Sequence, residues 1–291
     1  MARWTTTMSR TSMVRSLART AVGRFLLRVG RELRDLELID RGMTLAAHVF
    51  TSVLPILIVA GALRESLDPG SDPIIAEHLL FDEATAQMLE DSLPGEAQEL
   101  QATGIVGVIL LVIAATSFAR ALERSLRTIW RTPSVGIRFA WRWLAALGAV
   151  LSGLALIVAT RIVVRGAGPM SVVGFLIEVV LWSALWWFAS WIVINRRVSL
   201  PALLPGSVLA GIGFAAAGSF GRLLLPPLLA DSAARFGVLG MAFTYVGWLL
   251  VLSCILLLAA TMGRVLYLSY RGRAWRRSAL TPARDAAVHS R

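Results

Sequence analysis

The residues of this 291-residue chain with the clearest potential for chemistry are arginines, since all 29 basic side chains are arginine and none is lysine. Four of them recur at helical spacing and are expected to line one face of a helix: Arg120, Arg124, Arg127 and Arg131. Guanidinium groups suit bidentate contacts with phosphate oxygens, which makes these residues candidate contacts for anionic lipid headgroups. The alternative is a positive anchor at the cytoplasmic surface, with Glu123 paired to Arg127.

Three ionisable residues lie within or at the end of apolar stretches, where a charge is costly and therefore informative: His48, Arg161 and Glu178. If the chain turns near residues 168–169, Arg161 and Glu178 lie at equal depth, and we expect them to form an ion pair. A structural role for this pair is favoured over a relay for protons or substrate. His48 is expected to hydrogen-bond to a neighbouring helix rather than act as a ligand, and Pro55 is expected to kink its helix.

The residue types needed for catalysis are sparse and scattered. One cysteine and three widely separated histidines exclude a disulfide framework and the usual paired-histidine metal sites. Hydrolysis of RNA would need clustered carboxylates or an acid–base pair, and the loops expected in the cytoplasm offer Glu123 alone. No glycine-rich phosphate-binding loop is present in the sequence. We therefore expect no enzyme activity, no cofactor and no metal site.

The composition is that of a membrane protein, with 56% hydrophobic and only 16% charged residues. A soluble domain carries roughly 25% charged residues, so this chain has too little polar surface for a globule. Crossing a bilayer takes about 20 apolar helical residues. Six stretches reach or approach that length, and backbone hydrogen bonding in lipid makes them helices: residues 42–63, 104–119, 143–160, 172–194, 203–225 and 237–262. The predicted fold class is an all-α bundle of six transmembrane helices.

The distribution of arginine predicts the orientation of these spans. Alternate connecting segments carry 24 arginines on one side and five on the other, which places both termini in the cytoplasm. The net charge of +11 is thereby explained as a topology signal, and we expect no nucleic acid partner. Residues 1–41 form a cytoplasmic segment with an amphipathic helix on the membrane surface, and 271–291 a basic cytoplasmic tail. The acidic residues 64–103 are expected to form a small helical cap outside the membrane.

Small and aromatic residues suggest how the helices pack. The fifth span carries a stripe of small residues at four-residue spacing, with a second stripe beside it: Ser207, Gly211, Ala215 and Ser219, then Gly213, Ala217 and Gly221. Such stripes let helix backbones approach closely, so this helix is expected at the centre of the bundle or at the seam of a homo-oligomer. Trp182 and Trp186 share a face of the fourth span, where packing is favoured over an acyl-chain groove.

Three local patterns resemble the YihY/BrkB family of bacterial inner-membrane proteins, once mislabelled ribonuclease BN. They are an Ala-rich stretch with Ser52 and Pro55, the run Ser-Phe-Ala-Arg-Ala-Leu-Glu-Arg at 117–124 followed by Ile-Trp and Pro, and Asn-Arg-Arg-Val at 195–198 followed by Leu-Pro-Gly. The resemblance covers roughly residues 15–270. It implies six transmembrane helices and a role in the bacterial envelope, without an agreed biochemical activity. Many members carry Gly-Ala-Glu near the end of the last span; this chain has Met262-Gly263-Arg264, so no function of that carboxylate is expected.

Two functions fit these observations. The favoured one is translocation of a lipid or another amphiphile in support of envelope integrity, because of the arginine stripe, Glu178, and the kinked and glycine-rich helices. The alternative is a non-catalytic scaffold that docks an envelope protein through the acidic outer cap. Membrane lipids with anionic headgroups are the expected partners of the first, in the cytoplasmic membrane of a bacterium.

Overall fold

The computed structural model describes residues 20–67, 97–133, 172–194 and 197–288, together with Gly148 and Gly153. Within these ranges all regular structure is helical, which confirms the predicted all-α class there. The five helices are α2 (Ala21–Asp35), α3 (Leu38–Leu67), α6 (Ala97–Trp130), α8 (Val172–Val193) and α9 (Leu200–Val288). Residues 1–19 and 68–96, most of the predicted third span at 143–160, and residues 289–291 lie outside the described residues.

Three of the described helical segments are long and apolar enough to cross a membrane: Val106–Trp130, Val172–Val193 and Leu200–Tyr270. The predicted second and fourth spans, residues 104–119 and 172–194, overlap the first two of them except for one or two end residues. The first span, residues 42–63, falls within α3. The segment Leu200–Tyr270 contains both the fifth and the sixth predicted spans. The total of six spans stays a prediction.

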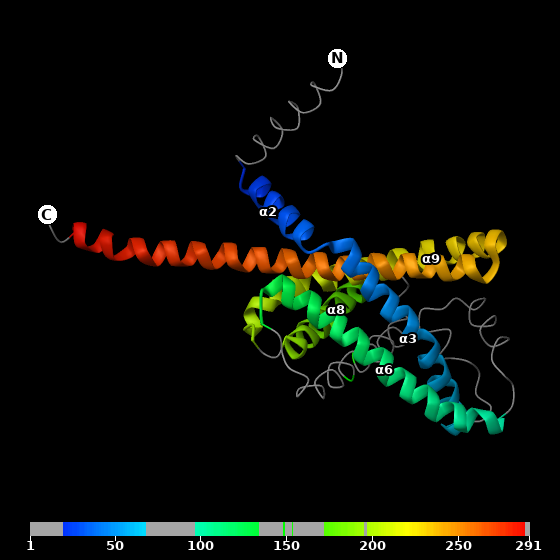
Figure 1. Ribbon diagram of the computed structural model, residues 1–291. Coiled ribbons are helices and arrows are strands. Elements are labelled where there is room, and N and C mark those ends of the chain that lie inside the picture. The colour runs from blue at the N-terminus through cyan, green and yellow to red at the C-terminus, as the bar shows by residue number, and fades with distance from the viewer. Residues whose placement is uncertain are drawn as a thin grey trace, which may run out of the picture.

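The helix α9 is a long antiparallel hairpin that folds back at Gly237 (Figure 1). This residue has φ 61° and ψ −149°, a conformation that glycine adopts without a steric penalty. The two arms lie against each other, because a methyl group added at Gly221 would meet Trp248, and Thr244 donates a 3.0 Å hydrogen bond to Ser232. Helical structure continues to Phe236, so residues 226–236, expected between two spans, lengthen the first arm.

The helices share one hydrophobic core at the end of the bundle where α2 joins it, which we call the α2 end (Figure 1). The start of α3, the last turns of α6 and α8 and the start of α9 meet there. Burial along α6 follows this arrangement, since most side chains from 115 to 129 are buried and most from 106 to 113 are exposed. The largest fully buried side chains lie at this end: Leu45, Leu126, Ile194, Leu257 and Val265.

The helix α2 is the amphipathic helix expected before the first span. Thr20 caps it by accepting a 3.0 Å hydrogen bond from the backbone N–H of Gly23. Val29 and Leu36 are buried against the bundle, whereas Val22 and Leu26, on the same stripe one or two turns earlier, are exposed. Half of the apolar face of α2 therefore extends beyond the protein's own core.

Candidate functional site

The buried carboxylate of Glu178 on α8 faces an arginine of α9. Arg222 Nη1 lies 3.7 Å from Glu178 Oε1, and the two side chains are 47% and 10% exposed respectively. The predicted partner, Arg161, lies outside the described residues, so the Arg161–Glu178 pair stays a prediction. Sequence reasoning did not single out Arg222. The sequence could have indicated this residue, because Arg222 is the one ionisable residue in the apolar run from 203 to 230.

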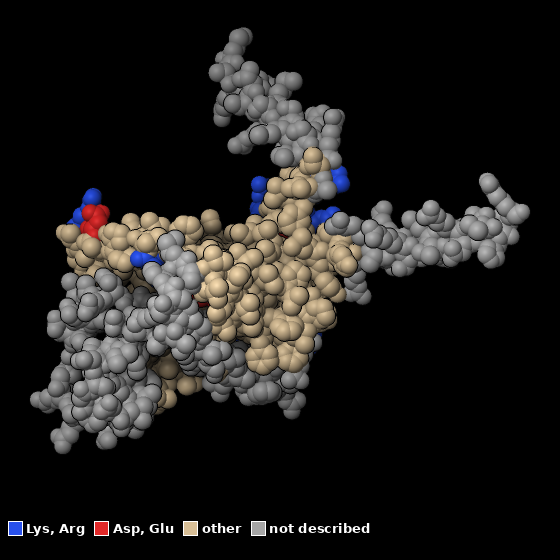
Figure 2. Space-filling view, turned by 180° about the vertical axis from the view of Figure 1, so that it is seen from behind, with Lys and Arg blue, Asp and Glu red and all other residues tan. Residues whose placement is uncertain are grey.

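The Glu178–Arg222 pair lies within the apolar surface of the bundle rather than at its edge. Beyond Arg222 the first arm of α9 continues with exposed Leu223, Leu224 and Leu228. The next charged residue, Asp231, follows nine positions later, about 13 Å along a helix. On the face in Figure 2, charged residues gather at the tip of the α9 hairpin and around α2, and the surface between them is mostly tan. An ion pair in such a surface is a candidate functional site.

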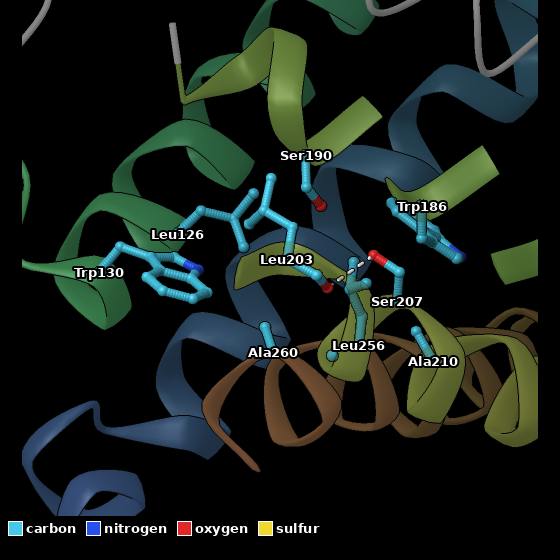
Figure 3. Close-up of a pocket in the computed structure, with 10 residues that line it drawn as sticks. Leu126, Trp130, Trp186, Ser190, Leu203, Ser207, Ala210, Leu256 and Ala260 are labelled. Atoms are coloured by element: carbon cyan, nitrogen blue, oxygen red, sulfur yellow. Dashed lines mark hydrogen bonds between the residues drawn. The ribbon is translucent and has the colours of Figure 1, made fainter. Parts of the chain in front are cut away.

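A small cavity lies between α8 and the start of α9, near the α2 end (Figure 3). Ser190 of α8 and Ser207 of α9 both line it, and Ser207 donates a 3.1 Å hydrogen bond to the carbonyl oxygen of Leu203. Its volume of about 20 Å³ holds roughly one water molecule. This cavity is too small for a lipid chain.

The tryptophans of α8 pack against the first arm of α9. The rings of Trp182 and Trp186 lie 4.8 and 5.2 Å from the ring of Phe214, measured between centroids. Their buried indole N–H groups have no hydrogen-bond partner in the described part of the chain. This geometry is the helix packing that was favoured over an acyl-chain groove.

The predicted stripe of four arginines is divided among different contacts. Arg127 lies 3.5 Å from Glu123, the pairing expected for an anchor, and Arg131 lies 3.4 Å from Glu32 of α2. Arg120 donates a 3.3 Å hydrogen bond to Ser117, and Arg124 is exposed. The first two turns of the stripe therefore present guanidinium groups to the surface.

His48 lies on α3, half-buried and close enough to Arg120 and Arg124 of α6 for electrostatic interaction. The sequence placed His48 in the first span and the arginine stripe on a cytoplasmic helix after the second span, without a contact between them. The antiparallel packing of α3 and α6 brings them together at one level of the bundle. The two arginines are cationic and His48 lies beside them, and we call this surface of three side chains the α3–α6 basic patch.

The two stripes of small residues face two different helices. A methyl group added at Gly211 would meet Ser183 and the backbone of Val179 on α8, and one added at Gly213 would meet Ile255 on the second arm of α9. Ser207 and Ala215 of the first stripe are buried, and Ser219 donates to the Ala215 carbonyl oxygen. The first arm of α9 thus lies between α8 and the second arm.

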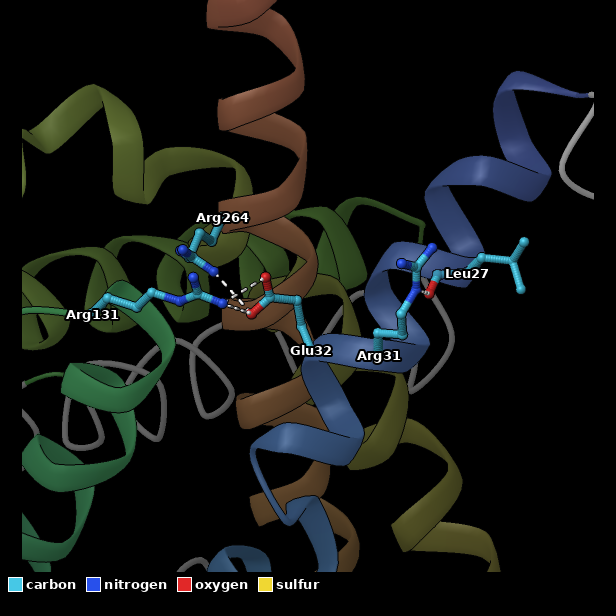
Figure 4. Close-up of polar contacts among 5 residues, drawn as sticks. All are labelled: Leu27, Arg31, Glu32, Arg131 and Arg264. Carbon is cyan, nitrogen blue, oxygen red and sulfur yellow. Dashed lines mark hydrogen bonds and ion pairs between the residues drawn. The ribbon is translucent and has the colours of Figure 1, made fainter.

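A second charged cluster ties α2 to the rest of the bundle (Figure 4). The carboxylate of Glu32 lies between Arg131, directly after α6, and Arg264 of α9, with Arg264 Nη1 3.0 Å from Glu32 Oε2. Arg31, one residue before Glu32, points away and donates to the carbonyl oxygen of Leu27. Sequence reasoning did not connect these residues, because 232 positions separate Glu32 from Arg264.

The described residues contain no group of three or more His, Cys, Asp or Glu side chains that could hold a metal ion. Cys254, the single cysteine, packs near Gly42 at the start of α3. The charged groups with potential function are therefore the Glu178–Arg222 pair, the α3–α6 basic patch and the cluster around Glu32.

Comparison with known proteins identifies the family. The family model named Virulence factor BrkB matches residues 29–281, which spans every described helix except the first turns of α2 and the last turns of α9. No solved structure matches the chain. The resemblance in the sequence patterns is thereby confirmed, and with it the classification as a membrane protein with apolar helices. This chain belongs to the Virulence factor BrkB family.

Proposed function

We propose that this protein translocates a lipid or another amphiphile across the bacterial cytoplasmic membrane and so supports the integrity of the envelope. In this proposal the α2 end faces the cytoplasm, with both termini there, as the arginine distribution predicts. The Glu178–Arg222 pair then lies in the half of the membrane away from the cytoplasm.

The observation that carries the proposal is the exposure of Arg222 inside an apolar surface. An ion pair that serves packing alone is best enclosed, since a charge facing lipid is costly. Here Glu178 is enclosed and Arg222 is half exposed, between exposed Phe220 and Leu223. A guanidinium group so placed offers two parallel N–H donors to the phosphate of a passing headgroup. The acyl chains would remain in the lipid beside α8 and α9.

The α3–α6 basic patch supplies the matching contact at the cytoplasmic side. Arg120 and Arg124 are exposed one helical turn apart, and His48 adds a third nitrogen donor next to them. Basic residues near a membrane surface attract anionic lipids by about 1 kcal/mol each. An amphiphile would be gathered at this patch before its headgroup crosses the apolar surface.

A scaffold function is the second candidate, and the tip of the α9 hairpin favours it. Phe236, Val238, Leu239 and Phe243 are all exposed around the turn at Gly237. Exposed apolar patches often mark sites of protein–protein contact. The acidic outer cap predicted at 64–103 would border such a site, and its residues 68–96 lie outside the described residues.

Reconstitution into liposomes tests translocation directly. Fluorescent phospholipids in the outer leaflet are followed in liposomes that contain the purified protein, the Arg222→Ala variant or the Arg120→Ala/Arg124→Ala variant. The proposal predicts that the protein accelerates transbilayer movement over empty liposomes and that both variants lose most of the acceleration. Arg235→Ala is the matched control, because Arg235 is equally an exposed arginine of α9 but pairs with Asp231 at the hairpin tip.

The control should retain the full rate. If no acceleration appears with several different headgroups, translocation of phospholipids is refuted and the scaffold becomes the better explanation. If the protein accelerates movement but all variants are as fast as the wild type, the pathway does not pass the Glu178–Arg222 pair.

A further inference from the structure

The cluster around Glu32 joins three segments that are far apart in the sequence. Glu32 Oε2 lies 3.0 Å from Arg264 Nη1, and Arg131 Nη2 lies 3.4 and 3.5 Å from the two carboxylate oxygens (Figure 4). One turn earlier on α2, Arg28 donates a 3.4 Å hydrogen bond to Ser269 of α9. Both oxygens of a single carboxylate are therefore used by arginines of the two other segments.

The charges in this cluster do not balance. Two guanidinium groups contact one carboxylate, so these three charged groups carry one positive charge in excess. Arg264 is the most enclosed of them, with a side chain 11% exposed. A charge taken out of water needs a full set of partners to offset its lost hydration. Glu32 provides one negative charge and two acceptor oxygens, which leaves an excess of positive charge at this point of the α2 end.

The backbone of Arg131 adopts a conformation that is unfavourable for a residue with a side chain. Arg131 follows the last turn of α6 with φ 51°, in the left-handed region where helices usually end on glycine. Any residue with a Cβ is disfavoured there, and such outliers cluster at functional sites. Glu37, at the joint between α2 and α3, has φ 55°. The arginine is thus held where glycine would be easier, and its guanidinium is directed at Glu32.

We propose that Arg131 and Arg264 form a binding site for a phosphoryl group at the cytoplasmic membrane surface, and that Glu32 occupies this site when no phosphate is bound. A phosphoryl group has the additional charge and the third oxygen that the carboxylate lacks, and its oxygens match the guanidinium fork. Arg131, with a side chain 67% exposed, provides the open side for entry. Binding displaces Glu32 and weakens the attachment of α2 to α9.

The rest of α2 can respond to that displacement. Its contact with the bundle rests on Val29, Leu36 and the polar contacts of Glu32 and Arg28. The exposed Val22 and Leu26, with arginines on the opposite face, suit a membrane surface. The α2 helix would therefore move from the bundle onto the lipid surface when a phosphoryl group replaces the Glu32 carboxylate at Arg131 and Arg264.

The first experiment measures a distance in the full chain, reconstituted in phosphatidylcholine nanodiscs. Spin labels are attached at Val22→Cys on α2 and Thr128→Cys on α6, in a Cys254→Ser background that leaves no other thiol. Inorganic phosphate is added, or phosphatidic acid is included in the nanodisc. The proposal expects a longer distance with at least one of these probes, and the probe that acts identifies free phosphate or a lipid headgroup as the source. An unchanged distance with both probes overturns it.

Variants then distinguish phosphate binding at Arg131 and Arg264 from a general effect of removing a positive charge. Arg131→Gln should abolish the response, since Arg131 is exposed and its loss leaves the fold intact, whereas Arg235→Gln at the hairpin tip should respond like the wild type. In a titration with inorganic phosphate, Glu32→Gln should raise the affinity by a factor within the usual range for coupled sites, roughly 5- to 150-fold. An unchanged affinity refutes Glu32 as the competing occupant. These measurements record binding without transport, so their outcome is independent of the proposed translocation.

Discussion

The tightness of the contact between α8 and the first arm of α9 can be tested at Gly211. A methyl group at this position would lie 2.6 Å from the backbone oxygen of Val179 and 2.8 Å from the backbone nitrogen of Ser183, and would also meet the Ser183 hydroxyl. Ordinary van der Waals contact needs about 3.4 Å or more, so the two backbones must separate. Overpacking of this kind costs about 1–3 kcal/mol.

Gly247 provides the matched control on the same helix, because a methyl group there would meet nothing within 4 Å. Alanine is favoured over glycine in a helix by about 1 kcal/mol, and this gain applies equally to both positions. The difference between Gly211→Ala and Gly247→Ala therefore isolates the overpacking, and we expect Gly211→Ala to be less stable by about 1–3 kcal/mol.

The measurement is the free energy of unfolding of each variant in mixed micelles, by titration with a denaturing detergent. Equal stabilities of the two variants, to within about 0.5 kcal/mol, would contradict the close approach of α8 and α9 at Gly211. A loss at both positions would show instead that glycine is needed along the whole of α9, and not specifically at this contact.

Three further tests probe other contacts by the same unfolding measurement. A double-mutant cycle with Glu178→Gln and Arg222→Gln should give a coupling energy of roughly 0.6–1.7 kcal/mol, the range for polar contacts within membranes, and a value near zero would mean that the pair is not formed. Arg131→Gly should be more stable than Arg131→Ala by about 1 kcal/mol, because only glycine adopts the left-handed conformation there without a penalty, and the reverse order would contradict φ 51°. Phe214→Ala should destabilise by roughly 3 kcal/mol through loss of both tryptophan contacts, and a near-neutral result would place that ring outside the core.

Apolar length and arginine distribution were sufficient to predict that the chain is helical and belongs in a membrane. These signals are local: each apolar stretch carries its own evidence for a helix, whatever it packs against. The amphipathic face of α2 was predicted for the same reason. The end of the first arm of α9 was not predicted, because the fifth span was bounded by its apolar run at Leu225, whereas the helix continues to Phe236.

The partner of Glu178 among the described residues could not be read from position along the chain. The expectation of Arg161 relied on equal depth in a hairpin of consecutive spans. In the structure, the register between α8 and α9 is determined by the close approach at Gly211, and this register places Arg222 beside Glu178. A stripe of small residues indicates that another helix packs closely against it, but the sequence does not identify that helix. The contact between Glu32 and Arg264 could not be predicted either, because the sequence does not show which helices are neighbours.

The length of the α9 hairpin bears on where the Glu178–Arg222 pair lies in a membrane. From Leu204 to Asp231 its apolar first arm is about 40 Å long, against a hydrocarbon thickness of about 30 Å. An upright hairpin would leave the exposed Leu224 and Leu228 in water, whereas a tilt of about 40° would cover them at little cost. Arg222 would then lie about 10 Å below the outer surface of the hydrocarbon core, at 1.5 Å per helical residue. At that depth the nearest source of phosphate oxygens is a lipid headgroup drawn inward, which is the event that translocation requires.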